Sequence, residues 1–361
     1  MNARTIPSLV SVCIFAVLAR SQTPLTTADG FAVPQPGHVF SFPRDYGSHP
    51  DFKLEWWYLT GHLFEKDGRR FGYQATFFRS AAPDKSTQLY LAHMALVDVK
   101  TGKFYYQERL NREGWDASAS TTILDVHNGP WSLRMTDPAT AHMELNGGVQ
   151  AEAAFALTLA PEKPLVIFGD GGVSRKGAES TAASYYLTFT RLRTAGTVTL
   201  GGSALEVTGE SWMDHEISSS QLGAKQVGWD WLSIQFNDDR EIMFYRLRLR
   251  DGTADPASSL TWVDAAGRTQ KSDFKWEVID SWKSPSTGAV YPSRVRLTTT
   301  DPATHHLASF TLEPLVQDQE LAGRLGGIPY WEGACRVLDE SGRAVGSAYL
   351  ELTGYAKDLK L

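Results

Sequence analysis

The sequence predicts an all-β fold, because short segments alternate apolar and polar residues with a period of two. In residues 245–250 every second side chain is apolar and the others are arginines, the pattern of a strand with one buried and one solvated face. Residues 274–278 repeat this alternation. No long segment carries a helical stripe, although a short turn is expected at 218–225. The chain is therefore expected to be mostly antiparallel β.

Further strands and turns follow from the same pattern. Strands are expected at residues 71–78, 89–97, 155–159, 185–190, 229–236 and 349–353. Turns are indicated by Asp67-Gly68, Asn146-Gly147-Gly148, Asp251-Gly252, Ala266-Gly267 and Ser341-Gly342. So many regularly spaced strands are expected to close into barrels or sandwiches, because closure removes exposed edges.

The length of 361 residues accommodates two such domains. We expect the boundary in the Gly- and Ser-rich segment between 201 and 223, with residues 22–220 as an N-terminal β domain and residues 221–361 as a C-terminal one. Each half opens with a Trp-rich strand, at 55–59 and 228–232, which suggests a duplicated architecture.

Residues 1–21 have the composition of a cleaved signal peptide. Arg4 supplies a positive start, Ile6 to Ala19 are nearly free of polar groups, and small residues precede Gln22. This apolar run is too short for a comfortable membrane span, and no later segment approaches the roughly 20 apolar residues that a spanning helix needs. We therefore expect a secreted or periplasmic protein with no stable membrane span.

The net charge and the cysteine content indicate which partners and cross-links are expected. Removal of residues 1–21 takes away Arg4 and Arg20 and no acidic residue, so the formal net charge changes from −6 to −8. A nucleic-acid partner is therefore not expected. Cys13 would leave with the signal peptide, and Cys335 would then have no intramolecular partner, so no disulfide is expected. Lipid modification of Cys13 is the weaker alternative.

Tryptophan beside carboxylate recurs along the chain. The densest instances are Ser211-Trp212-Met213-Asp214-His215-Glu216 and Gly228-Trp229-Asp230-Trp231. Large apolar rings can bury a mostly hydrocarbon substrate, and they raise the pKa of a neighbouring acid by lowering the local dielectric. The pattern therefore suggests acid catalysis on a hydrophobic small molecule.

Two arrangements of Asp214, His215 and Glu216 are compatible with the sequence. On an extended backbone both carboxylates face one way and the histidine the other, whereas a turn brings all three together. The functional interpretation is an acid of raised pKa with a histidine that orients or recycles its proton. A solvated charged turn is the more frequent fate of such a cluster, but the flanking Trp212 favours function.

Asp230 and His93 could each have either a functional or a structural role. Asp230 lies between Trp229 and Trp231 in a predicted strand, so either the two rings or the acid would face a cavity. Two core tryptophans with a surface aspartate are equally compatible with this pattern. His93 lies in an apolar strand, where a histidine paired by the backbone is more frequent than a ligand.

Several other chemistries are not indicated. His62, His93, Asp214, His215 and Glu216 have metal-binding side chains, but no His-x-x-x-His, His-Glu-x-x-His or paired-cysteine spacing occurs, so no metal is expected. Residues 169–174 lack the lysine of a phosphate-binding loop, and no Gly-x-Ser-x-Gly elbow occurs. No cofactor is expected.

Six ordered motifs resemble a known family, that of AttH and the carotenoid hydratases. They are Glu55-Trp56-Trp57-Tyr58-x-x-Gly61-His62, Ser184-Tyr185-Tyr186, Trp212-Met213-Asp214-His215-Glu216, Gly228-Trp229-Asp230-Trp231, Tyr330-Trp331-Glu332-Gly333 and Tyr349-Leu350-Glu351-Leu352-Thr353-Gly354-Tyr355. The resemblance implies two tandem lipocalin-like antiparallel β-barrel or sandwich domains with a hydrophobic cavity near their junction.

The resemblance also implies an activity. Members are similar to enzymes that add water to isolated double bonds of carotenoids or prenylated phenolics, and distant fungal relatives catalyse ring-forming cycloadditions. Some members are associated with export-permease gene clusters, so an export system is an expected partner. Ile217 stands where the family usually has tryptophan, which predicts a smaller or differently shaped pocket.

The expected site residues come from these motifs and their neighbours. The predicted catalytic residues are Asp214, His215, Glu216 and Asp230, and the predicted substrate-binding residues are Trp56, Trp57, Tyr58, His93, Trp212, Trp229, Trp231 and Tyr245. By contrast, the motifs at 55–57 and 330–332 are expected mainly to pack the opening and closing of the two barrels.

Three functions compete. The first is a hydratase in which a buried acid protonates an alkene, tryptophan faces stabilise the cation, and a carboxylate or His215 deprotonates water. The second is a lipocalin-like carrier that binds an apolar ligand without chemistry. The third is a cyclisation catalyst that acts through shape and hydrogen bonds.

Overall fold

A computed structural model of the protein describes residues 25–325 and 328–359. The expected signal peptide and Cys13 lie outside the described residues. Within the described ranges, no helix is long and apolar enough to cross a lipid bilayer. The predicted all-β class is confirmed: strands form two large sheets, and the described helix is the short 3-10 turn η1 (Arg44–Tyr46).

The first sheet has 13 strands and forms the N-terminal domain. Its strands are β1 (Leu54–Glu65), β2 (Arg70–Ala81), β3 (Gln88–Asp98), β4 (Lys103–Arg112), β5 (Ala117–Ala119), β6 (Asp125–Asn128), β7 (Trp131–Asp137), β8 (His142–Val149), β9 (Ala153–Pro161), β10 (Val166–Phe168), β11 (Ser174–Arg175), β12 (Ala183–Leu200) and β13 (Ser203–Ser220). The order is β4-β3-β2-β1-β13-β12-β9-β8-β7-β6-β5, with β10 and β11 paired to β12.

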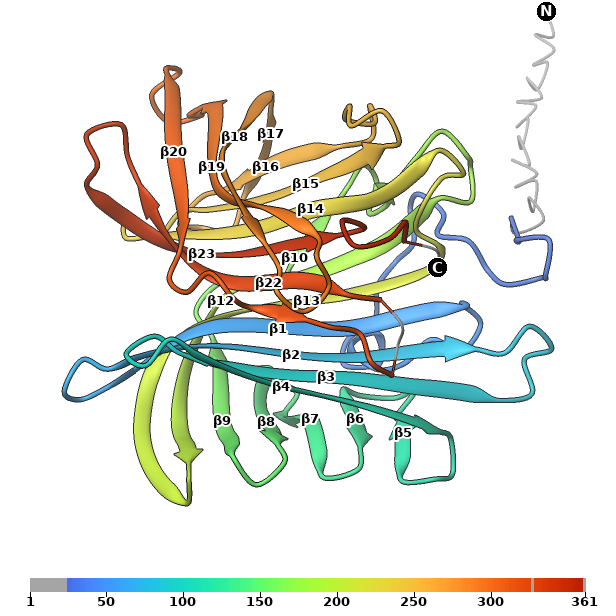
Figure 1. The fold of residues 1–361 in the computed structure, drawn as a ribbon. Coiled ribbons are helices and arrows are strands. Elements are labelled where there is room, and N and C mark those ends of the chain that lie inside the picture. The colour runs from blue at the N-terminus through green and yellow to red at the C-terminus, as the bar shows by residue number, and fades with distance from the viewer. Residues whose placement is uncertain (1–24, 326–327, 360–361) are drawn as a thin grey trace, which may run out of the picture.

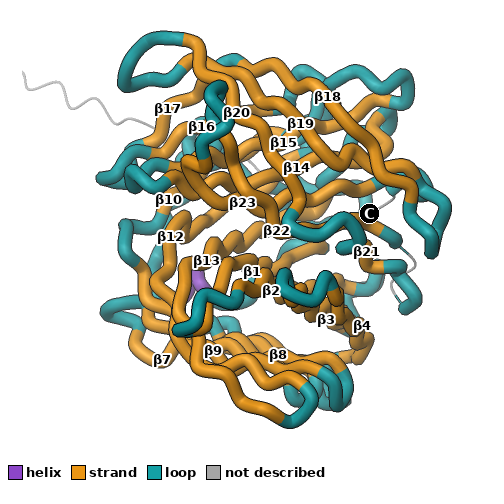
Figure 2. The backbone as a smooth tube through the Cα atoms, turned by 60° about the vertical axis from the view of Figure 1, so that its left-hand side comes forward, coloured by secondary structure: helices purple, strands orange, loops and turns teal. Residues whose placement is uncertain are grey.

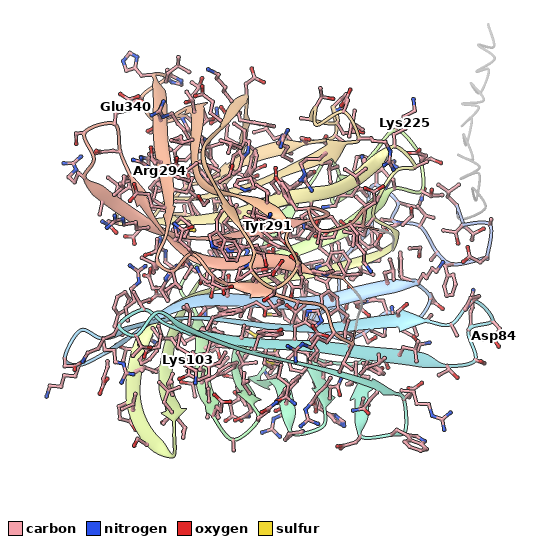
Figure 3. All side chains as sticks on the ribbon, in the orientation of Figure 1. Asp84, Lys103, Lys225, Tyr291, Arg294 and Glu340 are labelled. Atoms are coloured by element: carbon pink, nitrogen blue, oxygen red, sulfur yellow. The ribbon has the colours of Figure 1, made fainter. Side chains whose placement is uncertain are left out.

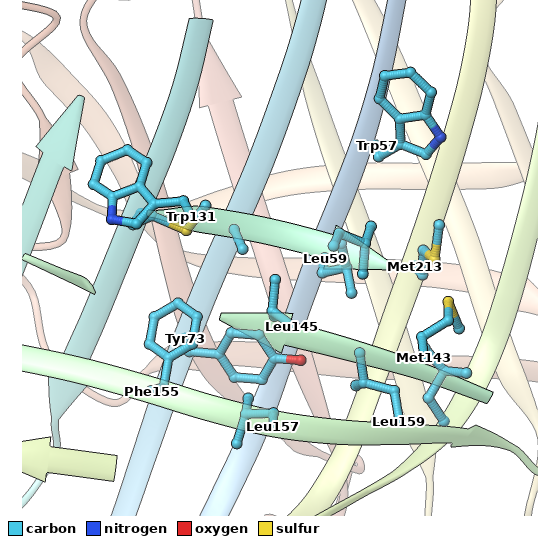
Figure 4. Close-up of a cluster of buried hydrophobic side chains, with 14 of the residues drawn as sticks. Trp57, Leu59, Tyr73, Trp131, Met143, Leu145, Phe155, Leu157, Leu159 and Met213 are labelled. Atoms are coloured by element: carbon cyan, nitrogen blue, oxygen red, sulfur yellow. The ribbon is translucent and has the colours of Figure 1, made fainter. Parts of the chain in front are cut away.

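This sheet curls until its two ends meet (Figure 2). Side chains join β4 to the far end of the sheet: Asn111 Nδ2 donates to Asn128 Oδ1 at 2.7 Å, and Asn128 Nδ2 donates to the Arg109 carbonyl at 3.3 Å. Closure encloses an apolar core that includes Trp57, Tyr73 and Phe155 (Figure 4). The barrel therefore has an interior of its own, separate from the face that β1–β4 turn toward the second domain.

The second sheet has 10 strands and forms the C-terminal domain. Its strands are β14 (Gln226–Phe236), β15 (Glu241–Leu249), β16 (Ser259–Val263), β17 (Thr269–Ser272), β18 (Phe274–Lys283), β19 (Val290–Thr300), β20 (Leu307–Pro314), β21 (Glu320–Leu321), β22 (Tyr330–Leu338) and β23 (Ala344–Thr353). The order is β17-β16-β15-β14-β23-β22-β20-β19-β18, with β21 paired to β22.

The two domains stack with β1, β2, β12 and β13 of the first facing β14, β22 and β23 of the second (Figure 1). Charged side chains such as Asp84, Lys103 and Arg294 project from the surface, whereas Tyr291 is buried inside the C-terminal domain (Figure 3). The change from one sheet to the other falls between Ser220 and Gln226.

Two local predictions were wrong. The expected turn at Asn146-Gly147-Gly148 lies within β8, because Gly147 allows close packing: a Cβ there would come 2.4 Å from the Phe155 ring. The expected turn at 218–225 was placed too early: residues through Ser220 are extended as the end of β13, and the turn lies at 223–226, where Gln226 N donates to the Gly223 carbonyl at 3.0 Å. Gly147 therefore marks a close approach of two strands rather than a local turn.

The arginine face of β15 is also covered, contrary to the expected solvated face. Arg248 is buried and its guanidinium lies over the Tyr355 ring, 3.7 Å from the centroid. Arg246 Nη1 donates to Asp230 Oδ2 at 2.8 Å. The C-terminal residues after β23 therefore supply a second layer that the alternation of β15 alone does not reveal.

Candidate functional site

A cavity of about 440 Å³ lies between the two domains. Its floor is the outer face of β1–β4, β12 and β13, and its roof is the facing surface of β14, β15, β22 and β23. Such a volume falls within the usual range for small-molecule sites. The side chains at the boundary of greatest chemical interest are Trp56, Tyr58, Thr76, His93, Lys176, Tyr186, Asp214, Glu216, Trp229, Trp231, Tyr245, Tyr330 and Glu351.

Strand register aligns polar side chains in one row across the floor. Directly paired positions are Glu108 with His93, His93 with Thr76, Thr76 with Tyr58, Tyr58 with Asp214, and Asp214 with Thr188. Because paired residues of an antiparallel sheet point to the same face, this row is polar across six strands.

The next row across the floor is mainly apolar. It runs from Leu110 and Leu91 through Phe78 and Trp56, and it ends at Glu216 and Tyr186. Leu110 and Leu325 are exposed and also border the cavity, so the apolar strip extends to the protein surface. A ligand in this cavity would meet a hydrocarbon surface along its length and polar groups at one side.

Asp214 accepts hydrogen bonds on both oxygens. Thr188 Oγ1 donates to Oδ1 at 2.6 Å, Trp212 Nε1 donates to Oδ1 at 2.7 Å, and the Tyr186 hydroxyl donates to Oδ2 at 2.7 Å. The Tyr186 oxygen accepts in turn from Trp231 Nε1 at 2.8 Å, which links the two domains. Burial raises the pKa of Asp214 to about 7, against the effect of these donors.

Glu216 is held by a buried lysine. Lys176 Nζ lies 3.1 Å from Glu216 Oε2, and the Ser184 hydroxyl donates to the same oxygen at 2.5 Å. The Lys176 ammonium also lies 4.6 Å from the ring centroid of Tyr186 and 4.4 Å from that of Tyr245. Aromatic faces and a carboxylate together therefore already stabilise one cation at the edge of this cavity.

Glu351 and Glu332 are cross-strand neighbours on the roof. Trp229 Nε1 donates to Glu351 Oε2 at 2.9 Å, and the Tyr58 hydroxyl donates to Glu332 Oε1 at 2.7 Å. Burial raises the pKa of Glu351 to about 7, and it raises that of Glu332 well above its usual range. Glu351 borders the cavity, whereas Glu332 lies behind the lining.

His93 and Tyr330 form a pair at the other end of the polar row. The Tyr330 hydroxyl lies 2.7 Å from His93 Nδ1, and the two rings stack with centroids 5.6 Å apart. Burial lowers the pKa of His93 to about 4, so its ring is neutral at neutral pH. Its Nε2 is buried without a hydrogen-bond partner among the described residues.

Eight of the twelve predicted site residues border the cavity, and four do not. Those at the cavity are Trp56, Tyr58, His93, Asp214, Glu216, Trp229, Trp231 and Tyr245; those elsewhere are Trp57, Trp212, His215 and Asp230. Strand alternation is the reason for Trp57, His215 and Asp230, because β1, β13 and β14 each turn successive residues to opposite faces. Trp212 shares the face of Asp214 but packs behind the cavity lining against Trp231, with ring centroids 6.1 Å apart. The extended alternative for residues 214–216 is therefore the one that the structure adopts.

His215 points into the N-terminal barrel and contacts Glu55. His215 Nε2 and His49 Nδ1 both lie 2.9 Å from Glu55 Oε1, and Arg79 Nε donates to Glu55 Oε2 at 2.9 Å. The ligand atoms of the two histidines and Glu55 lie within 4.8 Å of one another, a grouping that could hold a metal ion. However, Arg79 places a positive charge beside the same carboxylate, so we interpret the cluster as a hydrogen-bonded ion network.

Two further residues are placed away from the cavity. Asp230 is fully buried on the opposite face of β14, where Arg246 Nη1 and the Tyr355 hydroxyl donate to it at 2.8 and 2.9 Å. Ile217 packs with Tyr185 and Leu187 in a separate apolar cluster. Its replacement of tryptophan therefore does not change the cavity wall directly, contrary to the expected effect on pocket shape.

Sequence reasoning missed Lys176, Tyr186, Tyr330 and Glu351 as cavity residues. The signal for Glu351 was a carboxylate within the otherwise apolar strand 349–353. Tyr330 belongs to the motif Tyr330-Trp331-Glu332, for which the sequence predicted a packing role. Lys176 lies between β11 and β12 and carried no signal in the sequence.

Comparison with known proteins places this architecture in a family. The AttH-like family model matches residues 33–355. The crystal structure of NE1406 from Nitrosomonas europaea, a candidate AttH, shares 34% identity at a TM-score of 0.81 and covers 90% of this chain and 100% of its own. No curated protein matches the chain.

Two more distant structures share the fold. Kievitone hydratase from Nectria haematococca has 15% identity and a TM-score of 0.68, with 92% of this chain and 96% of that one covered. CghA, solved with Sch210972, has 12% identity and a TM-score of 0.59, with 92% and 98% covered. Both structures therefore have the same fold as this protein. The family match over residues 33–355, together with the 34% identity to NE1406, shows that this protein belongs to the AttH-like family.

Proposed function

We propose that this protein adds water across an isolated carbon–carbon double bond of an apolar, prenyl-bearing molecule bound between its two domains. One observation carries the proposal: two cavity carboxyls, Asp214 and Glu351, have pKa values raised to about 7 beside the rings of Trp229 and Trp231. A carboxyl that keeps its proton near neutral pH can protonate an alkene.

The remaining lining supports the same chemistry. Hydration through a carbocation needs an apolar surface for the substrate, aromatic faces for the cation and a base for the incoming water. The row from Leu91 to Trp56 supplies the first, and Trp229 with Trp231 supplies the second, worth roughly 0.5–2 kcal/mol for each desolvated ring. Glu216 is a carboxylate paired with Lys176 and serves as the base.

The size of the cavity favours a compact substrate. A volume of about 440 Å³ suits a prenylated phenol or a short terpenoid better than an entire carotenoid. That a distant structural relative is named a hydratase supports this class of reaction without identifying the substrate.

The direct test is incubation with prenylated phenols and short terpene alkenes in ¹⁸O-labelled water. We expect a product heavier than the substrate by one molecule of labelled water. The double variant Asp214→Asn/Glu351→Gln should still bind the substrate, measured by quenching of tryptophan fluorescence, but should form no product.

Other products would identify the competing functions. A bound but chemically unchanged ligand across the whole panel would favour the carrier, and a product of unchanged mass would favour a cyclisation or rearrangement. Either result, obtained with fully folded protein, contradicts hydration.

Export is a second part of the proposal. Residues 1–21 would direct the protein out of the cytoplasm, and an export system would be its partner there. Cell fractionation followed by N-terminal sequencing should find a mature chain beginning at Gln22, and an uncleaved cytoplasmic chain would contradict this part.

A further inference from the structure

Four carboxyls lie at or beside the cavity, and they differ in which oxygens are occupied. Asp214, Glu216 and Glu351 border the cavity, whereas Glu332 lies behind it. A proton donor must present an O–H to the substrate, and a base must present a free lone pair. The hydrogen-bond partners of each oxygen therefore separate the possible roles.

Both oxygens of Asp214 accept hydrogen bonds from protein donors. Trp212 Nε1 can only donate, and the Tyr186 hydroxyl donates to Asp214 Oδ2 while its oxygen accepts from the indole of Trp231. Thr188 adds a third donor. Asp214 therefore presents no unpartnered oxygen to a ligand, and losing its carboxyl group would release the Tyr186 ring, which borders the cavity, and the Trp212 ring behind it.

Glu351 has the opposite arrangement. Its Oε2 accepts from Trp229 Nε1 at 2.9 Å, whereas Oε1 has no hydrogen-bond partner among the described residues and is not among their buried unpartnered atoms. Glu351 borders the cavity, so Oε1 is the oxygen open to it. Because an indole N–H occupies Oε2, a proton on this carboxyl resides on Oε1 and faces a ligand.

Glu216 also has one oxygen without a protein partner. Its Oε2 is held by the Lys176 ammonium at 3.1 Å and by the Ser184 hydroxyl at 2.5 Å, both of them donors. Its Oε1 has no partner among the described residues and is likewise accessible. Because Glu216 is the anionic partner of the Lys176 ammonium, this oxygen offers a lone pair.

Building on the proposed hydration, we propose that Glu351 donates the proton to the alkene, that Glu216 accepts the proton of the attacking water, and that Asp214 is a positioning residue. The carboxyls that perform the chemistry come from β23 and β13, one in the roof and one in the floor. A substrate between the two sheets is thus contacted by the acid from one side and by the base from the other.

The reaction balances with these two groups. The π electrons of the alkene form a C–H bond with the proton of Glu351 Oε1, and the more substituted carbon becomes cationic beside Trp229 and Trp231. Water forms the C–O bond to that carbon and releases one proton to Glu216 Oε1. Transfer of this proton back to Glu351 through cavity water restores both groups, and the net change is addition of one water.

The test compares three glutamine variants on a prenylated phenol in D₂O. Glu351→Gln and Glu216→Gln should each lower kcat by roughly 10²- to 10⁴-fold with little change in KM, because each removes one proton-transfer partner. Glu332→Gln is the matched control: it changes an equally buried carboxyl one strand away that does not border the cavity, and it should leave kcat within a few fold. Retention of half of the wild-type rate by Glu351→Gln would overturn the assignment.

A second measurement does not depend on turnover. Infrared titration of the wild type should show carboxyl carbonyl absorbance that disappears as the pH rises through about 7, with contributions from both Glu351 and Asp214. Glu351→Gln should remove one part of this absorbance and Asp214→Asn the other. If Glu351→Gln loses as much absorbance over this pH range as the wild type does, Glu351 does not carry one of these protons and the inference fails even where hydration occurs. If Glu351→Gln removes its part of the absorbance but no alkene is hydrated by the wild type, the proposed reaction fails while the protonated state of Glu351 stands.

Discussion

Replacing Glu55 by glutamine tests whether His215 belongs to a structural network rather than to the cavity chemistry. Glu55 is fully buried and accepts bonds from Ser48 Oγ, the backbone and ring of His49, Arg79 and His215, each at 2.9 Å. An amide keeps the shape of the side chain but removes its charge and places an NH₂ group against these donors. Arg79, which is 1% exposed, would lose its anionic partner.

The expected cost is large because one partner of a buried ion pair is lost. Breaking such a pair typically costs about 3–5 kcal/mol. For a unit of 150–250 residues each kcal/mol shifts Tm by about 2–4 °C, so Glu55→Gln should lower Tm by about 6–20 °C. Calorimetry and urea unfolding would measure this loss. Glu144→Gln, which breaks an exposed pair with Arg134, should change stability by no more than about 1 kcal/mol.

The pH dependence gives an independent check. Burial opposes ionisation of Glu55, but bonds from His215 and His49 and the charge of Arg79 hold its pKa well below the usual range. A lowered pKa contributes stability that is present above the ordinary glutamate value and is lost as the pH falls toward the folded value. The wild type should therefore lose more stability than Glu55→Gln on acidification. If Glu55→Gln is as stable as Glu144→Gln and loses as much stability on acidification as the wild type, the network interpretation is refuted.

Three further outcomes follow from the same contacts. Asp230→Asn should destabilise the protein by about 3–5 kcal/mol, because Arg246 loses a buried partner, while ligand affinity stays unchanged in a fluorescence titration. Gly147→Ala should cost about 1–3 kcal/mol in urea unfolding, because its Cβ meets the Phe155 ring. Burial raises the pKa of Glu351 to about 7, so the folded state binds more protons, and both kcat and stability should fall as the pH rises through this value. Glu351→Gln should lose less stability over this range than the wild type, with Asp214 supplying the part that remains.

Most of the fold could be predicted from the sequence. Alternation located strands such as β2 and β15 correctly, and the ordered motifs led to the lipocalin-like plan. The errors share one cause: Gly147 and the arginines of β15 are defined by what packs on them from distant segments. The alternation of residues along a strand predicts which face of the sheet a side chain occupies, but it does not predict which distant segments pack on that face.

The site could be predicted only in part, for a related reason. Alternation correctly required that Asp214 and Glu216 share one face and that Trp229 and Trp231 share another. It could not show that Glu351 lies against these rings, because that pairing depends on the register of β14 with β23, more than a hundred residues apart. Lys176 reaches Glu216 from a connecting segment, where no periodicity constrains its direction.

The same alternation explains why a single motif serves two regions of the molecule. β13 lies between the barrel interior and the interdomain cavity, so successive residues of Asp214-His215-Glu216 enter different environments. His215 closes a charged network on one side, whereas both carboxylates face an apolar ligand site on the other. A rigid charged network directly behind the strand fixes the backbone that presents the carboxylates. Stability on one face thus supplies the preorganisation that proton transfer on the other face requires.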